Sequence, residues 1–226
     1  MVEEKVALER KINKIINEFK VKAVIFDLDG TLIDNNSYHR KTWEKYLNSK
    51  GRSISNAEFN AHLNGRTNHD AIEYIYGKGI SNEESVKYTL EKEALYREMY
   101  SPYITPVSGL IGLLKIFYEH NIPMAIATSG IQPNIDFMFD HIPIKKYFKA
   151  VVNSSHIKKG KPNPEIYMKT ASILGIAPQN CLVFEDAVVG INAAKAAGTK
   201  VIAITTTQPK EELSDADMII EDYEKF

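Results

Sequence analysis

Short apolar runs rich in β-branched residues alternate with segments of helical periodicity along most of this 226-residue chain. Such runs are typical of strands that are buried on both faces, and helical segments supply the crossovers that parallel strands require. The runs cover residues 21–27, 122–128, 150–153, 182–184, 201–205 and 218–220. The helical segments that accompany them cover residues 110–118, 131–139, 165–174 and 187–197. The alternation predicts an α/β fold built on a doubly wound parallel sheet.

One long stretch lacks the strand pattern. Between residues 35 and 105 helical patterns cover residues 38–47, 57–63, 70–76 and 83–100. We therefore predict an N-terminal helix at 1–20, a catalytic core made of 21–34 and 106–226, and a helical cap at 35–105, with hinges near Asn35 and Thr105. The cap follows the carboxyl end of the first strand, where open α/β sheets bind ligands, so it is placed to cover that crevice. We expect Trp43 and the aromatic residues of 88–103 to fill the cap's own core.

The charge balance excludes several classes of partner. Lys and Arg number 28 against 29 Asp and Glu, so a basic face for nucleic acid is not expected. Residues 1–20 lack the apolar segment of a signal peptide, and no apolar run approaches the ~18–20 residues that span a bilayer. The lone Cys181 excludes an intrachain disulfide and fits a reducing cytoplasm. A monomer is expected, with a homodimer as the alternative.

Two acidic motifs follow predicted strands directly. Asp27 and Asp29 precede Gly30 after the first strand, and Glu185 and Asp186 close the strand that begins near residue 181. Parallel strands place their carboxyl ends at one edge of the sheet, and four carboxyl groups there repel one another unless a cation lies among them. Oxygen ligands without a His or Cys cluster favour Mg²⁺. The alternatives are a solvated acidic rim and, for the first motif alone, an ordinary turn.

Two further strand ends carry groups that suit an anion. Thr128 and Ser129 close the run 122–128, and Ser129 with Gln132 fits a helix capping box, so both hydroxyls are predicted at a helix amino terminus, where an anion binds readily. Lys161 stands before a Pro-Asn-Pro helix start, where Asn163 can cap the helix. This rigid start fixes the direction of Lys161, whereas a solvated basic loop is the interpretation for its neighbouring lysines.

Taken together and in this order, these motifs resemble the haloacid dehalogenase superfamily of phosphoryl-transfer enzymes. The order is Asp-x-Asp-Gly-Thr, a Thr-Ser strand end, Gly-Lys-Pro and Glu-Asp. The helical cap directly after the first motif is similar to that of the β-phosphoglucomutase-like phosphatase group. The resemblance covers residues 21–220 and leaves the N-terminal helix outside it.

The resemblance implies a role for each motif. Asp27 would attack phosphorus and form an aspartyl phosphate, and the ordinary pKa of an Asp, about 3.9, predicts that it is ionised at neutral pH. Asp29 would be the acid and base. Mg²⁺ would be held by Asp27, Asp186 and the backbone carbonyl of Asp29, with Glu185 acting through water or as a supporting partner. The presence of Asp29 argues against dehalogenation.

The remaining roles concern phosphate and substrate. Thr128 and Ser129 would hydrogen-bond phosphate oxygens, and Lys161 would place a positive charge beside them. From the cap, the predicted substrate contacts are His39, Asn64, Arg66 and Thr67. A surface histidine and a surface ion pair are the alternatives for His39 and Arg66.

The resulting functional hypothesis is a Mg²⁺-dependent phosphohydrolase for a small phosphoester, such as a sugar phosphate, or for pyrophosphate. The alternative is a β-phosphoglucomutase that interconverts β-glucose 1-phosphate and glucose 6-phosphate. Mutases of this type carry a Ser-rich strand end followed by Lys where this chain has Thr128-Ser129-Gly130, and their cap arginine comes later than Arg66, so the hydrolase is favoured. A binding protein that merely retains the fold is the third hypothesis.

Overall fold

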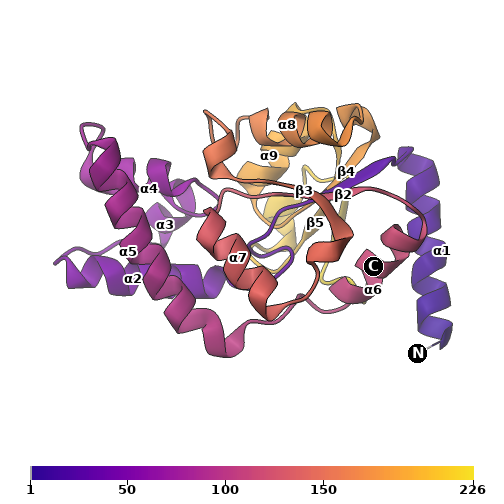
Figure 1. The fold of residues 1–226 in the computed structure, drawn as a ribbon, viewed down its shortest axis with the longest axis horizontal. Helices are drawn as coiled ribbons and strands as arrows, with labels where there is room; N and C mark the ends of the chain where they lie inside the picture. Colours follow the sequence, from indigo (N-terminus) through magenta and orange to yellow (C-terminus); the bar gives the residue numbers. More distant parts are fainter. Residues whose placement is uncertain (1) are drawn as a thin grey trace.

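A six-stranded parallel sheet organises the computed structural model, which describes residues 2–226 (Figure 1). The strands lie side by side in the order β3-β2-β1-β4-β5-β6, and every neighbouring pair is parallel. Their bounds are β1 (Ala23–Phe26), β2 (Met124–Ala127), β3 (Phe148–Val152), β4 (Cys181–Glu185), β5 (Lys200–Ile204) and β6 (Met218–Ile220). All six predicted strands are present, and the predicted α/β fold with a doubly wound sheet is confirmed.

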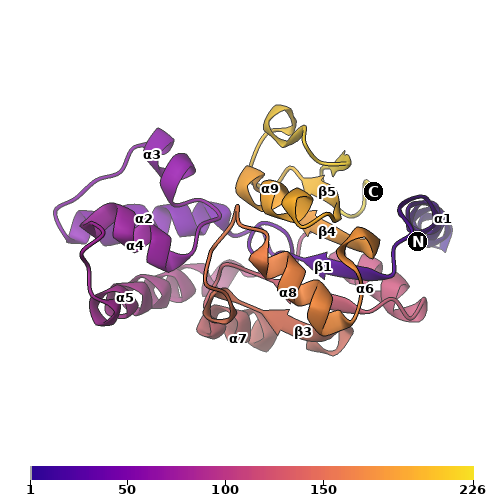
Figure 2. The same ribbon diagram turned by 90° about the horizontal axis from the view of Figure 1, so that it is seen from above.

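Each face of the sheet is buried under helices, as the unbroken apolar runs predict. Along β1, Val24 and Phe26 join the hydrophobic cluster on one face, whereas Ala23 and Ile25 join the cluster on the other. The first face is covered by α1 (Val2–Phe19), α6 (Leu110–Glu119) and α7 (Gln132–His141). The second face is covered by α8 (Glu165–Leu174) and α9 (Val188–Ala196). Figure 2 shows α8 and α9 crossing the sheet on that side.

The chain reverses its direction of winding at β1. From β1 it passes to β2 and β3 on one side, and then returns to β4, which pairs with β1 on the other side. In open α/β sheets a crevice forms at the carboxyl ends of the strands where this reversal occurs, and ligands bind there. The fold therefore places the crevice between the ends of β1 and β4.

Between β1 and β2 the chain forms a helical insert that extends to one side of the sheet (Figures 1 and 2). Its helices are α2 (Asn36–Ser49), α3 (Asn56–His62), α4 (Asn68–Tyr76) and α5 (Asn82–Tyr100). Ser55 and Ser81 start α3 and α5 with capping boxes, because each hydroxyl accepts from the backbone N–H of the glutamate three residues later. These caps place both helix starts one residue earlier than the hydrophobic pattern indicates.

The insert has a hydrophobic core that includes Trp43 and Phe59. The expectation that all the aromatic residues of 88–103 fill this core is wrong for three of them, and of these Tyr103 is exposed. Tyr96 and Tyr100 are buried in the main cluster beside the sheet. They lie on the side of α5 that faces the sheet domain, so α5 contributes to both cores.

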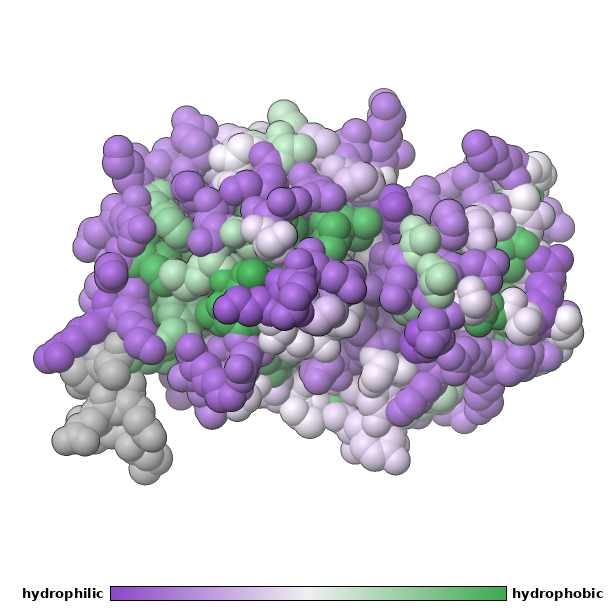
Figure 3. Space-filling view, turned by 180° about the vertical axis from the view of Figure 1, so that it is seen from behind, coloured by the Kyte–Doolittle hydropathy of each residue, from purple (hydrophilic) through white to green (hydrophobic). Residues whose placement is uncertain are grey.

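Helix α1 packs against the sheet domain through Ile12 and Ile15, which are buried in the main cluster. Its Lys11 donates to the backbone carbonyl of Phe226, so the middle of α1 contacts the last residue of the chain. Figure 3 shows that hydrophobic residues on one face of the molecule are interrupted by hydrophilic side chains. Within residues 2–226, no helix combines the length and the apolar character that crossing a bilayer requires.

Candidate active site

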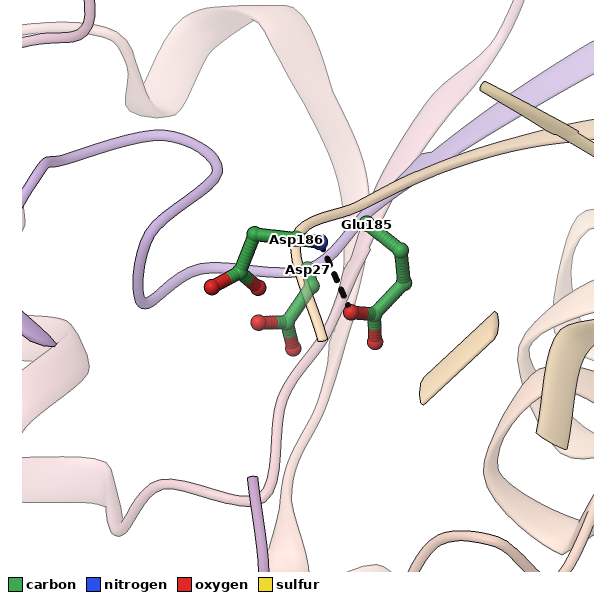
Figure 4. A group of neighbouring side chains, drawn as sticks. All are labelled: Asp27, Glu185 and Asp186. Carbon is green, nitrogen blue, oxygen red and sulfur yellow. Dashed lines mark hydrogen bonds between the residues drawn. The ribbon is translucent and has the colours of Figure 1, made fainter. Parts of the chain in front are cut away.

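Three carboxylates converge where β1 and β4 end. Phe26 pairs with Phe184, so Asp27 leaves β1 beside Glu185 and Asp186. Each of the three offers an oxygen within 4.8 Å of the others, and all three are buried. In Figure 4 the carboxylates of Asp27 and Asp186 point to the same side, whereas Glu185 turns away from them and accepts a hydrogen bond from the backbone N–H of Asp186. The predicted meeting of the two acidic motifs is therefore seen for these three residues.

Two glycines make room for this cluster. A Cβ at Gly30 would lie 2.1 Å from Oδ2 of Asp186, and the backbone there has a φ of +74°, which favours glycine. A Cβ at Gly190 would lie 1.8 Å from Oε1 of Glu185. A glycine is thus required after β1 because two strand ends approach each other closely there. The Asp-Gly pair is therefore more than an ordinary turn.

Lys161 supplies a positive charge inside the cluster. Its Nζ lies 2.7 Å from Oδ1 of Asp27 and 2.5 Å from Oε1 of Glu185, and the side chain is 3% exposed. Glu185 also accepts from the hydroxyl of Tyr167 and from the backbone N–H groups of Asp186 and Ala187. Because Glu185 is occupied in this way, it holds Lys161 in place beside Asp27.

The cluster carries more negative charge than Lys161 can balance. Burial raises the pKa of Asp27 to about 8; the Lys161 charge opposes this rise, and the Glu185 and Asp29 carboxylates add to it. Burial also raises the pKa of Asp186 well above its usual range, helped by the charges of Glu185 and Asp27. The ordinary pKa of an Asp therefore does not describe this buried carboxyl group, whose ionised form depends on the positive charge beside it. A site of oxygen donors with excess negative charge fits a hard divalent cation.

Asp29 lies apart from the three clustered carboxylates and faces the insert. Its Oδ1 accepts from Nδ2 of Asn35 at 2.6 Å, and Nε2 of His39 lies 3.4 Å away. Burial raises the pKa of Asp29, but the charge of His39 and the hydrogen bonds from His39 and Asn35 outweigh it, so the pKa falls below its ordinary value. The His39 ring stacks on Tyr96 at 3.9 Å between centroids, which fixes the orientation of the imidazole.

Thr128 and Ser129 line the same cavity, where their hydroxyls contact the protein itself. Oγ1 of Thr128 accepts from the backbone N–H of Gly130 at 2.9 Å, and Ser129 donates to the backbone carbonyl of Gly65 in the insert at 3.2 Å. The predicted capping box of Ser129 with Gln132 is wrong, because α7 begins at Gln132 without a side-chain cap. The Ser129 hydroxyl is bound to the insert instead.

The insert supplies the opposite wall of the cavity. Of the predicted cap residues, His39, Asn64 and Arg66 line it, and Nη1 of Arg66 donates to the backbone carbonyl of Lys161 at 3.1 Å. Thr67 has a different place. Its hydroxyl caps α4 by accepting from the backbone N–H of Asp70 and donating to the Asp70 carboxylate, so the structure gives it a structural contact.

Several lining residues were not identified from the sequence. They are Asn36, Trp43, Asn68, Lys92, Glu93 and Asn134. Lys92 and Glu93 are both 2% exposed and form an ion pair of 2.9 Å. Neighbouring charges in a helix rich in Lys and Glu normally indicate a solvated face, so only the packing of α5 reveals that these two are buried.

Comparison with known proteins agrees with the motifs. Residues 24–204 match the family model of the haloacid dehalogenase-like hydrolases. The chain belongs to this hydrolase family. The resemblance inferred from the four strand-end motifs is thereby confirmed, and relatives of this haloacid dehalogenase-like hydrolase place it in the β-phosphoglucomutase-like phosphatase group.

Relatives of this hydrolase include both phosphatases and a mutase. The fructose-1-phosphate phosphatase YqaB of Escherichia coli is 31% identical over 181 residues, which are 80% of this chain and 95% of that protein. The β-phosphoglucomutase of Bacillus subtilis is 30% identical over 210 residues, covering 88% of this chain and 89% of that protein. The crystal structure of a HAD hydrolase, family IA, variant 3, from Entamoeba histolytica superposes with a TM-score of 0.81 at 35% identity, covering 91% of this chain and 95% of that one.

Proposed function

We propose that this protein is a Mg²⁺-dependent phosphohydrolase that cleaves a small phosphomonoester, a sugar phosphate or a similar metabolite, through an aspartyl-phosphate intermediate. Pyrophosphate is kept as a further substrate to test. The observation that carries the proposal is the position of Asp27. Its carboxylate lies between Lys161 and Asp186 at the crevice of the sheet, in a cavity whose other wall is the helical insert.

Asp27, Asp186 and the backbone carbonyl of Asp29 would hold Mg²⁺, with Glu185 supporting them through its contacts to Lys161 and to the backbone. Bound there, the ion would favour the ionised form of Asp27 and Asp186 and offset charge on the phosphoryl group. The oxygen-only donor set and the excess negative charge of the cluster support this assignment.

In the first half of the reaction an oxygen of Asp27 attacks phosphorus in line with the leaving oxygen. The new bond to Asp27 forms while the bond to the leaving oxygen breaks, and the bonding electrons go to that oxygen, which takes a proton from Asp29. Lys161 stabilises the negative charge during transfer. The Thr128 hydroxyl accepts from Gly130 and can still donate to a phosphate oxygen, whereas the Ser129 hydroxyl can do so once it leaves the carbonyl of Gly65.

In the second half Asp29 takes a proton from water, whose oxygen attacks phosphorus. The bond to Asp27 then breaks and inorganic phosphate is released. The lowered pKa of Asp29 keeps its carboxylate ionised and so able to accept that proton. A phosphate group brought beside Asp29 raises its pKa through like-charge repulsion, which favours the protonated form required in the first half.

A mutase is the second candidate, favoured by one feature. Arg66 lies in the insert wall of the cavity, where its guanidinium could bind a second phosphate on a bisphosphate intermediate. Lys92 also lines this wall from the insert, but it is already paired with Glu93. With one arginine rather than several cations available for a second phosphate, hydrolysis is the better supported function.

A phosphate-release screen tests the proposal. Sugar phosphates, nucleotides and pyrophosphate are each incubated with the protein, with and without Mg²⁺, and we expect Mg²⁺-dependent release from one or more sugar phosphates. Asp27→Asn should lower the rate of phosphate release by several orders of magnitude. The variant should also take up no label from ³²P-labelled substrate, because it lacks the nucleophile. Turnover that survives either the substitution or chelation of the ion would contradict the proposal.

The product distinguishes the two candidates. When β-glucose 1-phosphate is supplied with a trace of the corresponding bisphosphate, the hydrolase yields glucose and free phosphate, whereas the mutase yields glucose 6-phosphate. A protein that binds no Mg²⁺ and turns over none of these compounds would instead be the binding protein considered from the sequence.

A further inference from the structure

The side-chain amide of Asn134 is held at both ends by α5. Its Nδ2 donates to Oε2 of Glu93 at 2.8 Å, and its Oδ1 accepts from Nη1 of Arg97 at 2.7 Å. Glu93 and Arg97 are one helical turn apart in the insert, whereas Asn134 lies in the first turn of α7, which packs on the sheet. Asn134 and Glu93 are 4% and 2% exposed, so this contact between insert and core is buried.

From Glu93 the contacts continue toward the reacting groups. Its Oε1 accepts from Nζ of Lys92 at 2.9 Å and from Nδ2 of Asn68 at 2.8 Å. Nζ of Lys92 also lies 3.2 Å from Nδ1 of His39. The other nitrogen of that ring faces Oδ1 of Asp29 at 3.4 Å. A continuous series of polar contacts therefore connects Asn134 to Asp29.

The two ends of this series belong to the core and its middle belongs to the insert. Asp29 follows β1 and Asn134 begins α7, while His39, Lys92 and Glu93 lie on α2 and α5. The series is complete only while the insert lies against α7. Every oxygen of Glu93 has a donor in this arrangement, and removing Asn134 would leave one buried carboxylate oxygen without a partner, which is costly in a water-poor site.

We propose that Asn134 is a positioning residue: through Glu93 and Lys92 it fixes the His39 ring beside Asp29 when the insert is docked on α7. Proton delivery from Asp29 to the leaving oxygen then depends on that docking. The inference rests on the proposed phosphohydrolase function. Arg97 assists by holding the Asn134 amide in the orientation that turns its N–H groups toward Glu93.

Leaving groups that differ in their need for a proton test this role. Benzyl phosphate and p-nitrophenyl phosphate have similar size, but only the benzyl alkoxide needs protonation as it departs. In Asn134→Leu, single-turnover release of benzyl alcohol should fall about 30-fold, a fraction of what general acid catalysis contributes, while release of nitrophenolate should fall less than about 3-fold. Equal losses with the two compounds would mean a merely structural role and would overturn the inference.

A reversed pair provides a second test. Asn134→Asp keeps the acceptor for Arg97 but sets a carboxylate against Glu93, so it should show the same selective loss. Adding Glu93→Gln to this variant restores the hydrogen bond in the opposite direction. The amide N–H of residue 93 then donates to the carboxylate of residue 134. The double variant should recover most of the benzyl phosphate rate, and a double variant as defective as Asn134→Asp would overturn the inference.

Two controls separate the possible failures. Asp140→Asn changes an exposed residue of the same helix and should leave both rates at the wild-type level. A wild-type protein that, in the presence of Mg²⁺, cleaves neither of these compounds and none of the sugar phosphates of the release screen overturns the proposed function, and the inference with it. A wild type that cleaves both, beside an Asn134→Leu variant that loses both equally, overturns the inference alone.

Discussion

The side-chain amide of Asn36 donates to Oδ2 of Asp186 at 2.9 Å, which joins the first residue of α2 to the acidic cluster of the core. The same nitrogen lies 2.6 Å from the hydroxyl of Thr207. Residues that hydrogen-bond to a metal-binding carboxylate fix its orientation and raise metal affinity. At the proposed Mg²⁺ site such a residue comes from the first turn of α2.

Replacing Asn36 should therefore weaken cation binding. In Asn36→Ala we expect the Mg²⁺ dissociation constant to rise about 10-fold, because Asp186 loses a fixed donor. Calorimetric titration with Mg²⁺ in the absence of substrate measures this directly. Asn82, which is the first residue of α5 and is exposed, offers a matched control, and Asn82→Ala should bind Mg²⁺ as the wild type does. Equal affinity in all three proteins would show that Asn36 does not support the site.

Gly30 gives a second prediction about the same carboxylate. Gly30→Ala combines an unfavourable φ of +74° with a Cβ 2.1 Å from Oδ2 of Asp186. Gly51 has a φ of +70° but has no atom within 4 Å of its added Cβ, so Gly51→Ala isolates the backbone strain, about 1–2 kcal/mol of the unfolding free energy. Urea unfolding should show a larger loss for Gly30→Ala, and only that variant should also lose Mg²⁺ affinity. Equal losses of unfolding free energy in the two variants would mean that Asp186 moves away from the added Cβ at no cost.

The part of the candidate site that is built from local sequence motifs could be predicted from the sequence. Asp27 and Asp186 each follow a strand end directly, and parallel strands bring such ends to one edge whatever their order. Lys161 lies farther along the chain, in the segment between β3 and α8. The order that makes β1 and β4 neighbours comes from packing, and the runs alone do not contain it. Asp29 turns toward the insert rather than into the cluster because Asn35 and His39 provide its partners there.

The insert wall was predicted less well, for a physical reason. Lys92 and Glu93 are buried only because α5 packs between the other helices of the insert and α7. No local pattern distinguishes them from the exposed charges of the same helix. Thr67 was interpreted as a substrate contact although Asp70 follows it by three residues, a spacing typical of a helix cap. Tertiary contacts decide which polar residues of such helices face a cavity.

Glu93 should make the stability of the protein depend on acidic pH. Burial raises the pKa of Glu93, but the charges of Lys92 and His39 and the hydrogen bonds from Lys92 and Asn134 lower it from 4.5 to about 2. A carboxyl group whose pKa is depressed by folding stabilises the protein above the unfolded pKa, and this stabilisation is lost as the pH falls through the folded pKa. The relevant window therefore runs from about pH 4.5 down to about pH 2.

We expect Glu93→Gln to be less stable than the wild type by about 3 kcal/mol at pH 6, and this difference to shrink as the pH falls below 4.5. Urea unfolding measured from pH 6 to pH 3 would follow the trend. Glu211 is exposed, so Glu211→Gln should track the wild type throughout the range. A difference between Glu93→Gln and the wild type that stays constant down to pH 3 would show that the carboxylate is not preferentially ionised in the folded protein.

Gly160, next to Lys161, allows the core to approach the insert closely. A Cβ at this position would lie 2.7 Å from Cγ2 of Thr67 and 2.8 Å from Oδ2 of Asp70, both at the start of α4. Gly160→Ala should therefore push α4 away from the loop that carries Lys161, and the wall of the cavity should open on that side. Because the backbone at Gly160 has no positive φ in the range that favours glycine, the effect arises from crowding alone.

The expected result is a higher KM with a smaller change in the rate of phosphoenzyme formation. A crowding cost of about 1 kcal/mol corresponds to a KM increase of about 5-fold for the sugar phosphate that the release screen identifies. Gly79→Ala is the matched control, because Gly79 also lacks a positive φ and its added Cβ meets nothing within 4 Å. If Gly160→Ala and Gly79→Ala both keep the wild-type KM, the contact between this loop and α4 has no part in enclosing the substrate. Displacing the insert from Lys161 would then leave the affinity for the substrate unchanged.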